Sequence, residues 1–368
     1  SFGWSGTNAH AVIEGPPEPG ARNGGRTDEV SLLALSARTP EALADLAGSW
    51  REFLDQGAGG AAVTDLCWTA LARRTHREFR LAVVGGTPAE LAKALGIPGE
   101  PTRAASAPRV AMVFPGQGSQ WPGMGRELMA GEPAFRKALE EVDRAIRTEA
   151  GFSVVETLGA ADVEARLAAI EVLQPTLFAF QVALAALWES FGIVPDVVVG
   201  HSLGEVSAAH VAGVLGLADA ARVICRRSRL LASIRGRGAM AVVVLSLAEA
   251  GEAIGARADR LSVAASNSPR STVLAGDSAA LEQLLAELEG RAVFARRVKV
   301  DVASHSPQVD PLRERLLGAL AGIAPGRARI RLVSTVTGQP LDGPEMGPSY
   351  WVDNLRRPVL FWPAADRL

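Results

Sequence analysis

The spacing of apolar residues in the first third of the chain alternates between strand and helix patterns. Residues 30–37 (V-S-L-L-A-L-S-A) and 80–85 (R-L-A-V-V-G) are short apolar runs of the kind that form strands. Between them a helical pattern begins at Thr39 and Pro40, where threonine suits the N-cap and proline suits the first helical turn. We therefore expect residues 31–97 to form a small α/β unit.

Two segments rich in proline and glycine flank this unit. Residues 15–30 and 98–108 have the composition of linkers. Beyond the second linker, apolar strands alternate with helical patterns, from 109–114 (R-V-A-M-V-F) to 195–200 (P-D-V-V-V-G). Alternation of this kind predicts an α/β fold built on a mostly parallel sheet.

The alternation changes between residues 239 and 300. A strand (A-M-A-V-V-V-L) and a helix are followed by two strands, L-S-V-A-A-S and S-T-V-L-A-G, and then by a second helix and a last strand. Asp277 or Ser278 suits the cap of that second helix. The order β-α-β-β-α-β is that of a small ferredoxin-like unit inserted into the larger fold.

Composition narrows the classes of function. The chain has 368 residues, which suggests two or more packing units, and its formal net charge of −2 provides no basic field for nucleic acid. Its 2 cysteines, Cys67 and Cys225, support neither a disulfide framework nor a metal cluster, so a reducing cytoplasm is expected. The longest apolar stretch, residues 173–188, is too short and too polar for a membrane span and predicts a buried helix.

Residues 200–204 read G-H-S-L-G and follow a run of valines. A G-x-S-x-G pattern between a strand and a helix is typical of a sharp turn that exposes a serine hydroxyl, here that of Ser202. The N–H of Leu203, at the start of the next helix, would face an incoming carbonyl and stabilise an oxyanion. The alternative is a tight turn in which the serine has no chemical role.

A serine nucleophile needs a base, and the chain has 5 histidines. His10 lies in the N-terminal tail, His76 among surface residues, His201 in the turn itself and His210 farther along the helix. His305, in V-A-S-H-S, remains by elimination and follows the inserted unit. The alternative is a loop histidine held by hydrogen bonds.

Two further segments contain candidate binding groups. P-G-Q-G-S-Q (115–120) follows the first strand of the large unit, and the N–H of Gln117 is a candidate second oxyanion donor. A phosphate loop would need a lysine that is missing, and an ordinary turn is the alternative. One arginine of R-R-S-R (226–229) could pair with a carboxylate, although such a run is more often a solvated surface.

These motifs together resemble the acyltransferase domains of modular type I polyketide synthases and, more distantly, the malonyl-CoA:acyl-carrier-protein transacylases. The motifs are F-P-G-Q-G-S-Q-W (114–121), Q-P-T-L-F-A-F-Q-V-A-L-A-A-L-W (174–188), G-H-S-L-G-E (200–205), R-R-S-R-L (226–230), A-S-H-S (303–306) and Y-W-V-D-N-L-R-R-P-V (350–359). The resemblance implies an α/β-hydrolase-like large subdomain with a parallel sheet, an inserted ferredoxin-like small subdomain and a small α/β linker domain at the N-terminus.

The resemblance also divides the chain into segments. Residues 1–14 would be the C-terminal tail of a ketosynthase, and residues 15–107 would be the ketosynthase-to-acyltransferase linker. The acyltransferase would occupy residues 108–368, with a large subdomain at 108–238 and 301–368 and a small one at 239–300. Family members continue beyond F-W-P-A-A-D-R-L with another helix and strand, so a truncated C-terminal end is expected.

The roles of the family residues are implied at the matching positions of this chain. Ser202 would be the acylated nucleophile and His305 its base, in a dyad without an acidic third member. Arg227 would bind the free carboxylate of the acyl group, and Asn354 would orient the histidine through its backbone carbonyl. The two backbone N–H groups named above would form the oxyanion hole.

Such a domain moves an acyl group from CoA to the serine and then to the phosphopantetheine thiol of an acyl carrier protein, with ping-pong kinetics. The resemblance thus implies acyl-CoA as the substrate, and an acyl carrier protein and the ketosynthase of the same polypeptide as partners. It implies no cofactor bound by the domain itself, and neither nucleic acid nor membrane as a partner. We expect the chain to be part of a cytoplasmic multifunctional enzyme.

The tetrapeptide that ends at the histidine tracks the extender unit in this family. Malonyl-selective members resemble H-A-F-H and methylmalonyl-selective members Y-A-S-H, whereas this chain has Val302-Ala303-Ser304-His305. The smaller residues favour an α-substituted malonyl group, ethylmalonyl or larger, with methylmalonyl as an alternative. Leu203 conflicts with this, because methylmalonyl-selective members usually have glutamine there. Met240 is a candidate wall of the pocket or an ordinary core residue.

Two other functions remain open on the sequence. A serine hydrolase or thioesterase of the α/β type needs an acid between the serine and the histidine in chain order, and Asp219 and Asp259 are available for it. A docking scaffold without catalytic activity is the second, and residues 1–107 are expected to have only that role.

Overall fold

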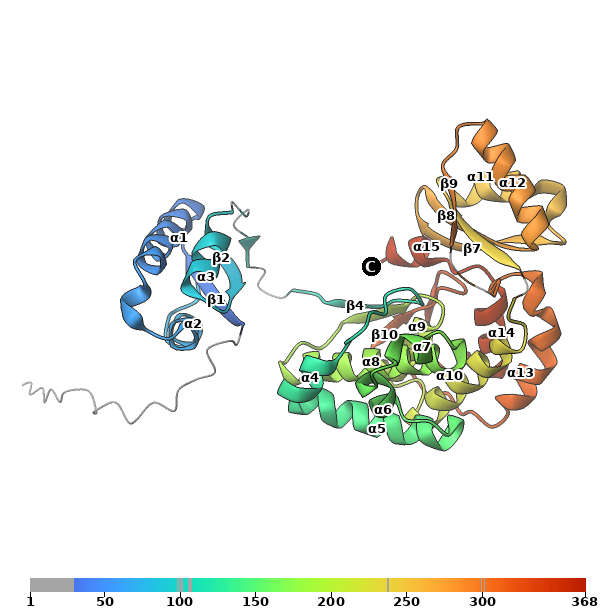
Figure 1. The fold of residues 1–368 in the computed structure, drawn as a ribbon, viewed down its shortest axis with the longest axis horizontal. Helices are drawn as coiled ribbons and strands as arrows, with labels where there is room; N and C mark the ends of the chain where they lie inside the picture. The colour runs from blue at the N-terminus through green and yellow to red at the C-terminus, as the bar shows by residue number, and fades with distance from the viewer. Residues whose placement is uncertain are drawn as a thin grey trace, which may run out of the picture. The chain divides into compact units, whose positions relative to one another are not determined.

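The structure is a computed structural model that describes residues 30–97, 99, 102–104, 108–236, 238–298, 300 and 302–368. The chain forms two compact units, Ser1–Pro108 and Arg109–Leu368 (Figure 1). The predicted ketosynthase tail, residues 1–14, lies outside the described residues, and so does His10.

The first unit is built on an antiparallel sheet in the order β1-β2-β3. Its elements are β1 (Ser31–Ala37), α1 (Pro40–Asp55), a 3₁₀ turn (Ala58–Gly60), α2 (Val63–Ala72), β2 (Phe79–Gly85), α3 (Pro88–Leu95) and β3 (Thr102–Arg103). The predicted cap of α1 is present, since the Thr39 hydroxyl accepts a hydrogen bond from the N–H of Ala42 at 3.2 Å. Buried leucines of β1, α1 and α3 form the core of this small α/β unit.

The second unit contains a sheet in the order β11-β10-β5-β4. Its strands are β4 (Ala111–Phe114), β5 (Val197–Gly200), β10 (Arg331–Val333) and β11 (Pro340–Leu341). β4, β5 and β10 run parallel, with Val197 opposite both Ala111 and Arg331, whereas β11 is antiparallel to β10. The predicted parallel sheet is confirmed, and β5 lies between two parallel neighbours with the G-x-S-x-G turn at its end.

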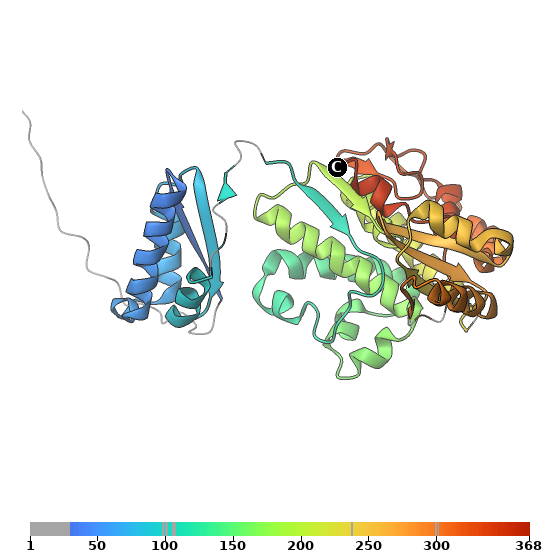
Figure 2. The same cartoon turned by 90° about the horizontal axis from the view of Figure 1, so that it is seen from above.

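Helices cover both faces of this sheet (Figures 1 and 2). Val198 of β5 points into the main core with residues of α8 and α9, whereas Val197 and Val199 pack against α15 on the other face. The helices are α4 (Arg126–Gly131), α5 (Pro133–Ala150), α6 (Val154–Gly159), α7 (Val163–Leu167), α8 (Ile170–Ser190), α9 (Gly204–Val211), α10 (Leu217–Ala232), α13 (Arg313–Ala319), α14 (Pro348–Arg356) and α15 (Phe361–Ala365), with a 3₁₀ segment at Pro307–Leu312.

The long helix α8 contains the apolar stretch that predicted a buried helix. By length and composition it could cross a membrane, yet 72% of its most apolar window is buried inside the protein. It packs against α5, α9 and α10. Burial in the core of the fold therefore accounts for its apolar sequence.

A second, smaller sheet is inserted between α10 and the 3₁₀ segment at Pro307. Its elements are β6 (Ala239–Val243), α11 (Leu247–Ile254), a 3₁₀ turn (Gly255–Arg257), β7 (Leu261–Ser268), β8 (Ser271–Gly276), α12 (Ser278–Gly290) and β9 (Ala295–Val298). The strands are antiparallel in the order β7-β8-β6-β9, and α11 and α12 cover one face, which confirms the ferredoxin-like fold (Figure 1). Of the two candidate caps of α12, Asp277 is the one present, because its carboxylate accepts from the N–H of Ala280 at 2.9 Å.

Candidate active site

Ser202 lies in the sharp turn between β5 and α9, in a left-handed backbone conformation with φ of 53°. The flanking glycines are required by close packing. A Cβ atom at Gly200 would lie 2.3 Å from the backbone of Glu205, and one at Gly204 would lie 2.1 Å from the carbonyl oxygen of Phe114. The turn therefore presses the start of α9 against the ends of β5 and β4, which leaves the serine side chain at the carboxyl end of the sheet.

His305 is the histidine that the fold brings to Ser202. The Ser202 hydroxyl lies 2.9 Å from Nε2 of the imidazole. On the other side of the ring, Nδ1 donates to the backbone carbonyl of Arg357 at 3.0 Å. Because a carbonyl can only accept, Nδ1 carries the ring hydrogen and Nε2 is free to accept the serine proton.

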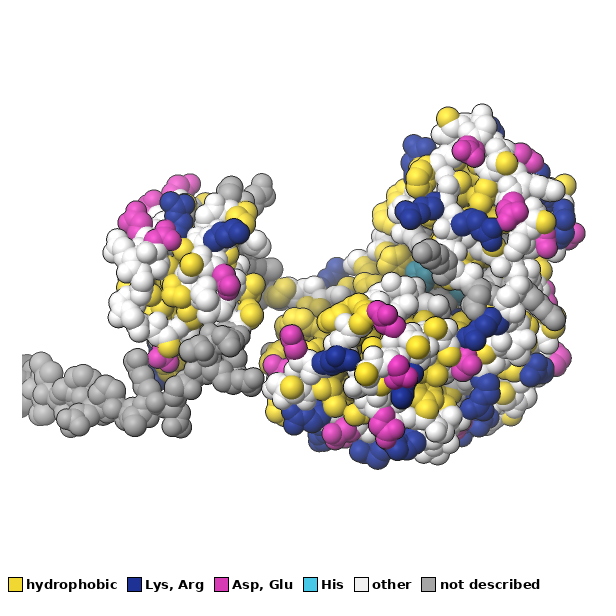
Figure 3. Space-filling model, viewed as in Figure 1, with side chains coloured by type: hydrophobic (Ala, Val, Ile, Leu, Met, Phe, Trp, Pro, Cys, Tyr) yellow, Lys and Arg dark blue, Asp and Glu magenta, His cyan; other side chains and the backbone are white. Residues whose placement is uncertain are grey.

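The environment keeps this imidazole neutral. His305 is buried, and the burial together with the nearby positive charge of Arg227 lowers the pKa of His305 to about 3. The ring is therefore in its basic form at neutral pH. In Figure 3, histidine atoms (cyan) are visible where the upper lobe of this unit meets its larger body.

Asn354 does not have the predicted role. The carbonyl that orients the imidazole belongs to Arg357, which follows the end of α14 in extended backbone conformation, so that this oxygen lies outside the helical hydrogen bonding. The side chain of Asn354 instead donates through Nδ2 to the backbone oxygen of Ser202 at 3.2 Å and to the carboxylate of Glu205 at 2.7 Å.

Arg227 on α10 is the arginine of R-R-S-R that reaches the serine. Its Nη2 donates to the Ser202 hydroxyl at 3.0 Å, and its Nη1 donates to the side-chain oxygen of Gln174 at 2.7 Å. Arg226 and Arg229, by contrast, bind Glu149 at distances of 3.1 and 3.3 Å. The charged group next to the Ser202 hydroxyl is therefore that of Arg227.

The guanidinium of Arg227 is buried without a resident counter-ion in contact. Only 1% of the residue is exposed, its Nε has no partner, and none of the described carboxylates lies within salt-bridge distance. Burial lowers the pKa of Arg227 to about 10, partly offset by the more distant charge of Glu205, so it remains a cation at neutral pH. A buried, unpaired cation is costly unless an anionic group binds it.

The two predicted oxyanion donors lie on different segments. Leu203 is the first residue after Ser202, at the N-cap of α9. Gln117 lies on the loop after β4, where Gly116 packs against His201, and its side chain accepts from Gln174 at 3.4 Å. In the described part of the chain, no hydrogen bond engages the backbone N–H of Leu203 or of Gln117.

The predicted selectivity residues separate into two environments. Val302 is buried in the main core of the large sheet. Ala303 instead packs on the open face of the small sheet, where Met240 contacts the same cluster, together with Ala264 and Ala275. Ser304 is partly exposed beside them. The structure thus brings Met240 and Ala303 together, with Val302 facing the opposite way.

The other three histidines that the structure describes make hydrogen bonds elsewhere. His201 bonds through Nε2 to the side chain of Asn267 on β7 at 2.9 Å, His210 bonds to the carbonyl of Leu215, and His76 is exposed. None of these three contacts Ser202. The elimination that left His305 therefore agrees with where each described ring points.

Sequence reasoning missed Glu205, which appears there only as the last residue of the motif G-H-S-L-G-E. Its side chain is completely buried, three residues after Ser202. Burial raises the pKa of Glu205 to about 7, against the hydrogen bonds from Thr335 and Asn354 that favour the ionised form. A lone glutamate in the first turn of a helix is an ordinary surface feature, so nothing in the local pattern distinguishes it.

The acids suggested for a hydrolase triad lie elsewhere. Asp219 accepts from the N–H of Ala324 at 3.1 Å and pairs with Arg222, and Asp259 is exposed. The position that a triad acid would occupy, next to Nδ1 of His305, is taken by the Arg357 carbonyl. In this structure the imidazole therefore contacts the Ser202 hydroxyl on one side and a backbone carbonyl, not a carboxylate, on the other.

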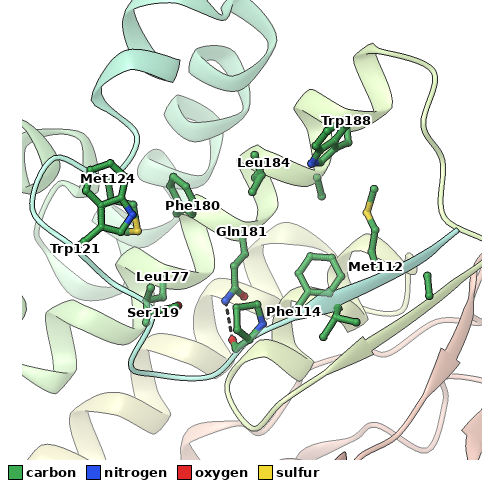
Figure 4. A pocket seen from close by; sticks show the side chains of 14 residues that line it. Met112, Phe114, Ser119, Trp121, Met124, Leu177, Phe180, Gln181, Leu184 and Trp188 are labelled. Atoms are coloured by element: carbon green, nitrogen blue, oxygen red, sulfur yellow. Dashed lines mark hydrogen bonds between the residues drawn. The ribbon is translucent and has the colours of Figure 1, made fainter. Parts of the chain in front are cut away.

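An apolar groove of about 420 Å³ between β4 and α8 is separate from these residues (Figure 4). Its lining includes Phe114, Trp121 and Trp188, and Gln181 crosses it to donate to the carbonyl of Pro115 at 2.7 Å. Ser202 and His305 are not part of the lining. Among the described residues, no group of three or more His, Cys, Asp or Glu could hold a metal ion.

Comparisons with known proteins agree with this geometry. Residues 111–368 match the family described as "Acyl transferase domain", and residues 31–95 match the family "CurL-like, PKS C-terminal". The chain is 43% identical to a mycocerosic acid synthase-like polyketide synthase of Mycobacterium tuberculosis, over 98% of this chain and 18% of that protein. It thus spans less than a fifth of this relative's length.

Solved structures show the same likeness. The acyltransferase domain from module 8 of the salinomycin polyketide synthase matches with a TM-score of 0.84 and 37% identity, over 92% of this chain and 82% of that one. The acyltransferase domain of SpnD, solved as a complex with 2-(pent-4-yn-1-yl)malonyl, matches with a TM-score of 0.82 and 31% identity, over 92% and 81%. The chain belongs to the acyl transferase domain family and is an acyltransferase of the polyketide synthase type.

Proposed function

We propose that this domain transfers an α-carboxylated acyl group from CoA, through an ester on Ser202, to the phosphopantetheine thiol of an acyl carrier protein. The observation that carries this proposal is the Arg227 guanidinium, which is buried, has none of the described carboxylates within salt-bridge distance, and lies 3.0 Å from the Ser202 hydroxyl. A cation in that position selects an acyl group with a free carboxylate, because a neutral acyl chain would leave the charge unpaired.

The first half-reaction acylates the serine. The Ser202 oxygen attacks the thioester carbonyl carbon while its proton moves to Nε2 of His305. The N–H groups of Leu203 and Gln117 are the candidate donors to the oxyanion that forms. When the C–S bond breaks, the departing CoA sulfur takes the proton from His305, which returns to its neutral form.

The second half-reaction repeats these steps with the carrier. The phosphopantetheine thiol gives its proton to Nε2 of His305 and attacks the acyl-serine carbonyl, and the ester oxygen of Ser202 recovers the proton as the acyl group leaves. The low pKa of His305 keeps Nε2 available as a proton acceptor at the start of each half.

For the acyl group itself, we propose an α-substituted malonyl unit, ethylmalonyl or larger, with methylmalonyl possible. The residues before His305 are small, and Met240 with Ala303 forms an apolar wall that could contact an α-substituent. The relative from SpnD was solved with a substituted malonyl group. Leu203 remains the feature that favours unsubstituted malonyl.

The surroundings of the domain are part of the same proposal. We infer an acyl carrier protein and a ketosynthase of the same polypeptide as partners in a cytoplasmic polyketide synthase, in which residues 15–107 connect the ketosynthase to the acyltransferase. The match of residues 31–95 to a polyketide synthase family supports this arrangement.

Replacing the nucleophile tests the transfer. Ser202→Ala should abolish both the acyl adduct on the domain and the loading of a carrier protein, measured by intact-protein mass spectrometry after incubation with substituted malonyl-CoA. The same spectra should show wild-type adducts discharged faster by carrier protein than by water. Carrier loading at the wild-type rate by the Ser202→Ala variant would favour a non-catalytic scaffold, and discharge mainly by water would favour a hydrolase.

A further inference from the structure

One helix, α14, contacts both members of the dyad. The backbone N–H of His305 donates to the carbonyl of Leu355 at 3.0 Å, and its ring donates to the carbonyl of Arg357 at 3.0 Å. From the same end of the helix, Asn354 donates to the backbone oxygen of Ser202 at 3.2 Å. The distance between the serine and the imidazole therefore depends on how α14 is held against the turn.

Glu205 holds that helix end in place. Its two carboxylate oxygens accept from the side chain of Asn354 at 2.7 Å and from the backbone N–H of Thr335 at 2.8 Å. The Thr335 hydroxyl in turn donates to the carbonyl of Gly200 at 2.8 Å. One buried carboxylate thus joins α9, the segment after β10 and α14 around the nucleophile.

The backbone at the dyad needs such support. Ser202 and His305 both have left-handed φ angles, 53° and 61°, although neither is glycine. A conformation of this kind costs about 1–3 kcal/mol per residue and persists only where the surrounding structure enforces it. Asn354 contributes to that enforcement through Nδ2, and because its Oδ1 has no partner in the described structure, the bonds of Nδ2 define its orientation.

We propose that Glu205 is a positioning residue for acyl transfer: acting through the Asn354 amide, its carboxylate keeps Ser202 in register with the helix end that orients His305. The inference rests on the proposed transfer at Ser202. Glu205 contacts neither Ser202 nor His305 through a side-chain hydrogen bond, so its effect is on geometry and not on proton transfer.

The charge of Glu205 gives this role a pH signature. The groups that face the carboxylate are Arg227 from α10, Tyr350 and Asn354 from α14, and Thr335 with Ser334 after β10. Because the pKa of Glu205 is raised to about 7, the carboxylate takes up a proton just below neutral pH, and its hydrogen bonds from Thr335 and Asn354 then lose the negative charge that strengthens them. The acylation rate should therefore fall below about pH 7, where His305, with a pKa of about 3, is still neutral.

The test is Glu205→Gln, whose amide can accept from only one of the two N–H donors. We expect its rate constant for Ser202 acylation to fall about 10–100-fold with the apparent KM within about twofold, since small displacements of reacting groups have effects of this size. The fall in acylation rate below about pH 7, called the pH limb below, should disappear in this variant. The substrate is a substituted malonyl thioester of pantetheine, which has no phosphate that titrates in this range, and adducts are read by intact mass under single-turnover conditions.

Asp143→Asn provides a matched control, because Asp143 is also a buried carboxylate of this unit that accepts from a hydroxyl and a backbone N–H, those of Ser153 and Val155. It should keep the wild-type rate constant and the pH limb. If Glu205→Gln does not fold, Asn354→Ala removes the same link while the carboxylate stays, and a similar loss of rate is expected.

The outcomes separate this inference from the proposed function. A folded Glu205→Gln, or Asn354→Ala in its place, that acylates at the wild-type rate with an unchanged pH limb would overturn the positioning role while leaving transfer intact. If Asp143→Asn loses as much acylation rate as Glu205→Gln and also loses the pH limb, the effect of Glu205→Gln is general destabilisation. That result would overturn the positioning role as well. Acylation of Ser202→Ala at the wild-type rate would instead refute the transfer itself.

Discussion

Replacing Arg227 by alanine removes a buried cation next to Ser202. In the wild-type structure the guanidinium donates to the Ser202 hydroxyl and to Gln174, and its Nε has no partner among the residues that the structure describes. If a substrate carboxylate pairs with this group, the variant should lose the preference for acyl groups with a free carboxylate. The perturbation therefore concerns which acyl group is loaded more than whether any is loaded.

The size of the effect follows from the bonds between Arg227 and the substrate carboxylate that the variant cannot make. Hydrogen bonds that involve a charged group contribute about 1.5–3 kcal/mol each. Two such bonds between the guanidinium and the substrate carboxylate, each at the lower part of that range, contribute about 3–4 kcal/mol. At about 1.4 kcal/mol per factor of ten, Arg227→Ala should lower kcat/KM for a malonyl-type CoA ester about 10²–10³-fold. The value for butyryl-CoA should stay level or rise, because no unpaired charge remains next to the acyl chain.

The assay compares rates of Ser202 acylation by ethylmalonyl-CoA and by butyryl-CoA, which differ by one carboxylate. Arg226→Ala is the control, since Arg226 lies one position away but pairs with Glu149 outside the site. The rate of labelling by a fluorophosphonate, which has no carboxylate, reports separately whether Ser202 remains reactive. A ratio of the two CoA esters that is the same in Arg227→Ala and in wild type would refute the assignment of Arg227 to the carboxylate.

Three further predictions concern stability. Gly204→Ala would place a Cβ atom 2.1 Å from the Phe114 carbonyl oxygen, so it should lower the free energy of unfolding by at least about 1–3 kcal/mol and reduce Ser202 labelling; wild-type values of both would contradict the close packing at the turn. Thr39→Ala removes the cap of α1 and should lower the stability of the first unit by about 1 kcal/mol in denaturant unfolding of the chain, with no change in acylation rate. Between about pH 4.5 and 6.5, the raised pKa of Glu205 makes stability fall as pH rises and the lowered pKa of His305 makes it rise. Glu205→Gln and His305→Gln should therefore change the slope of unfolding free energy against pH in opposite directions, and changes of the same sign would contradict the two pKa directions.

The sequence by itself determined the helices, strands and turns that depend on residues close together along the chain. The β-α-β-β-α-β order was visible in the apolar spacing of residues 239–300, and the glycines around Ser202 marked a turn that only residues without Cβ can make. The apolar α8 was recognisable as a core helix because polar residues interrupt it. Each of these features is set by neighbours along the chain.

A finer reading of periodicity would have distinguished Arg227 from the two arginines beside it. Val223, Arg227 and Leu231 are spaced four residues apart and all are buried on α10, so Arg227 lies on the apolar face of that helix. An arginine in a buried stripe is a stronger candidate for an anion site than its neighbours. The resemblance to a family named this residue, but the physical signal was present in the spacing.

Only the tertiary structure decided how Ser202 and His305 are held together. The carbonyl that orients His305 comes from Arg357 and not from Asn354, because the direction of a carbonyl at a helix end depends on where the helix stops and how the chain leaves it. The buried hydrogen bonds of Glu205 likewise depend on Thr335 and Asn354. These partners are more than a hundred residues away and meet Glu205 only in the folded domain. Apolar spacing records which faces are buried, whereas the pairing of buried polar groups is fixed by contacts between distant segments, and these leave no periodic trace along the chain.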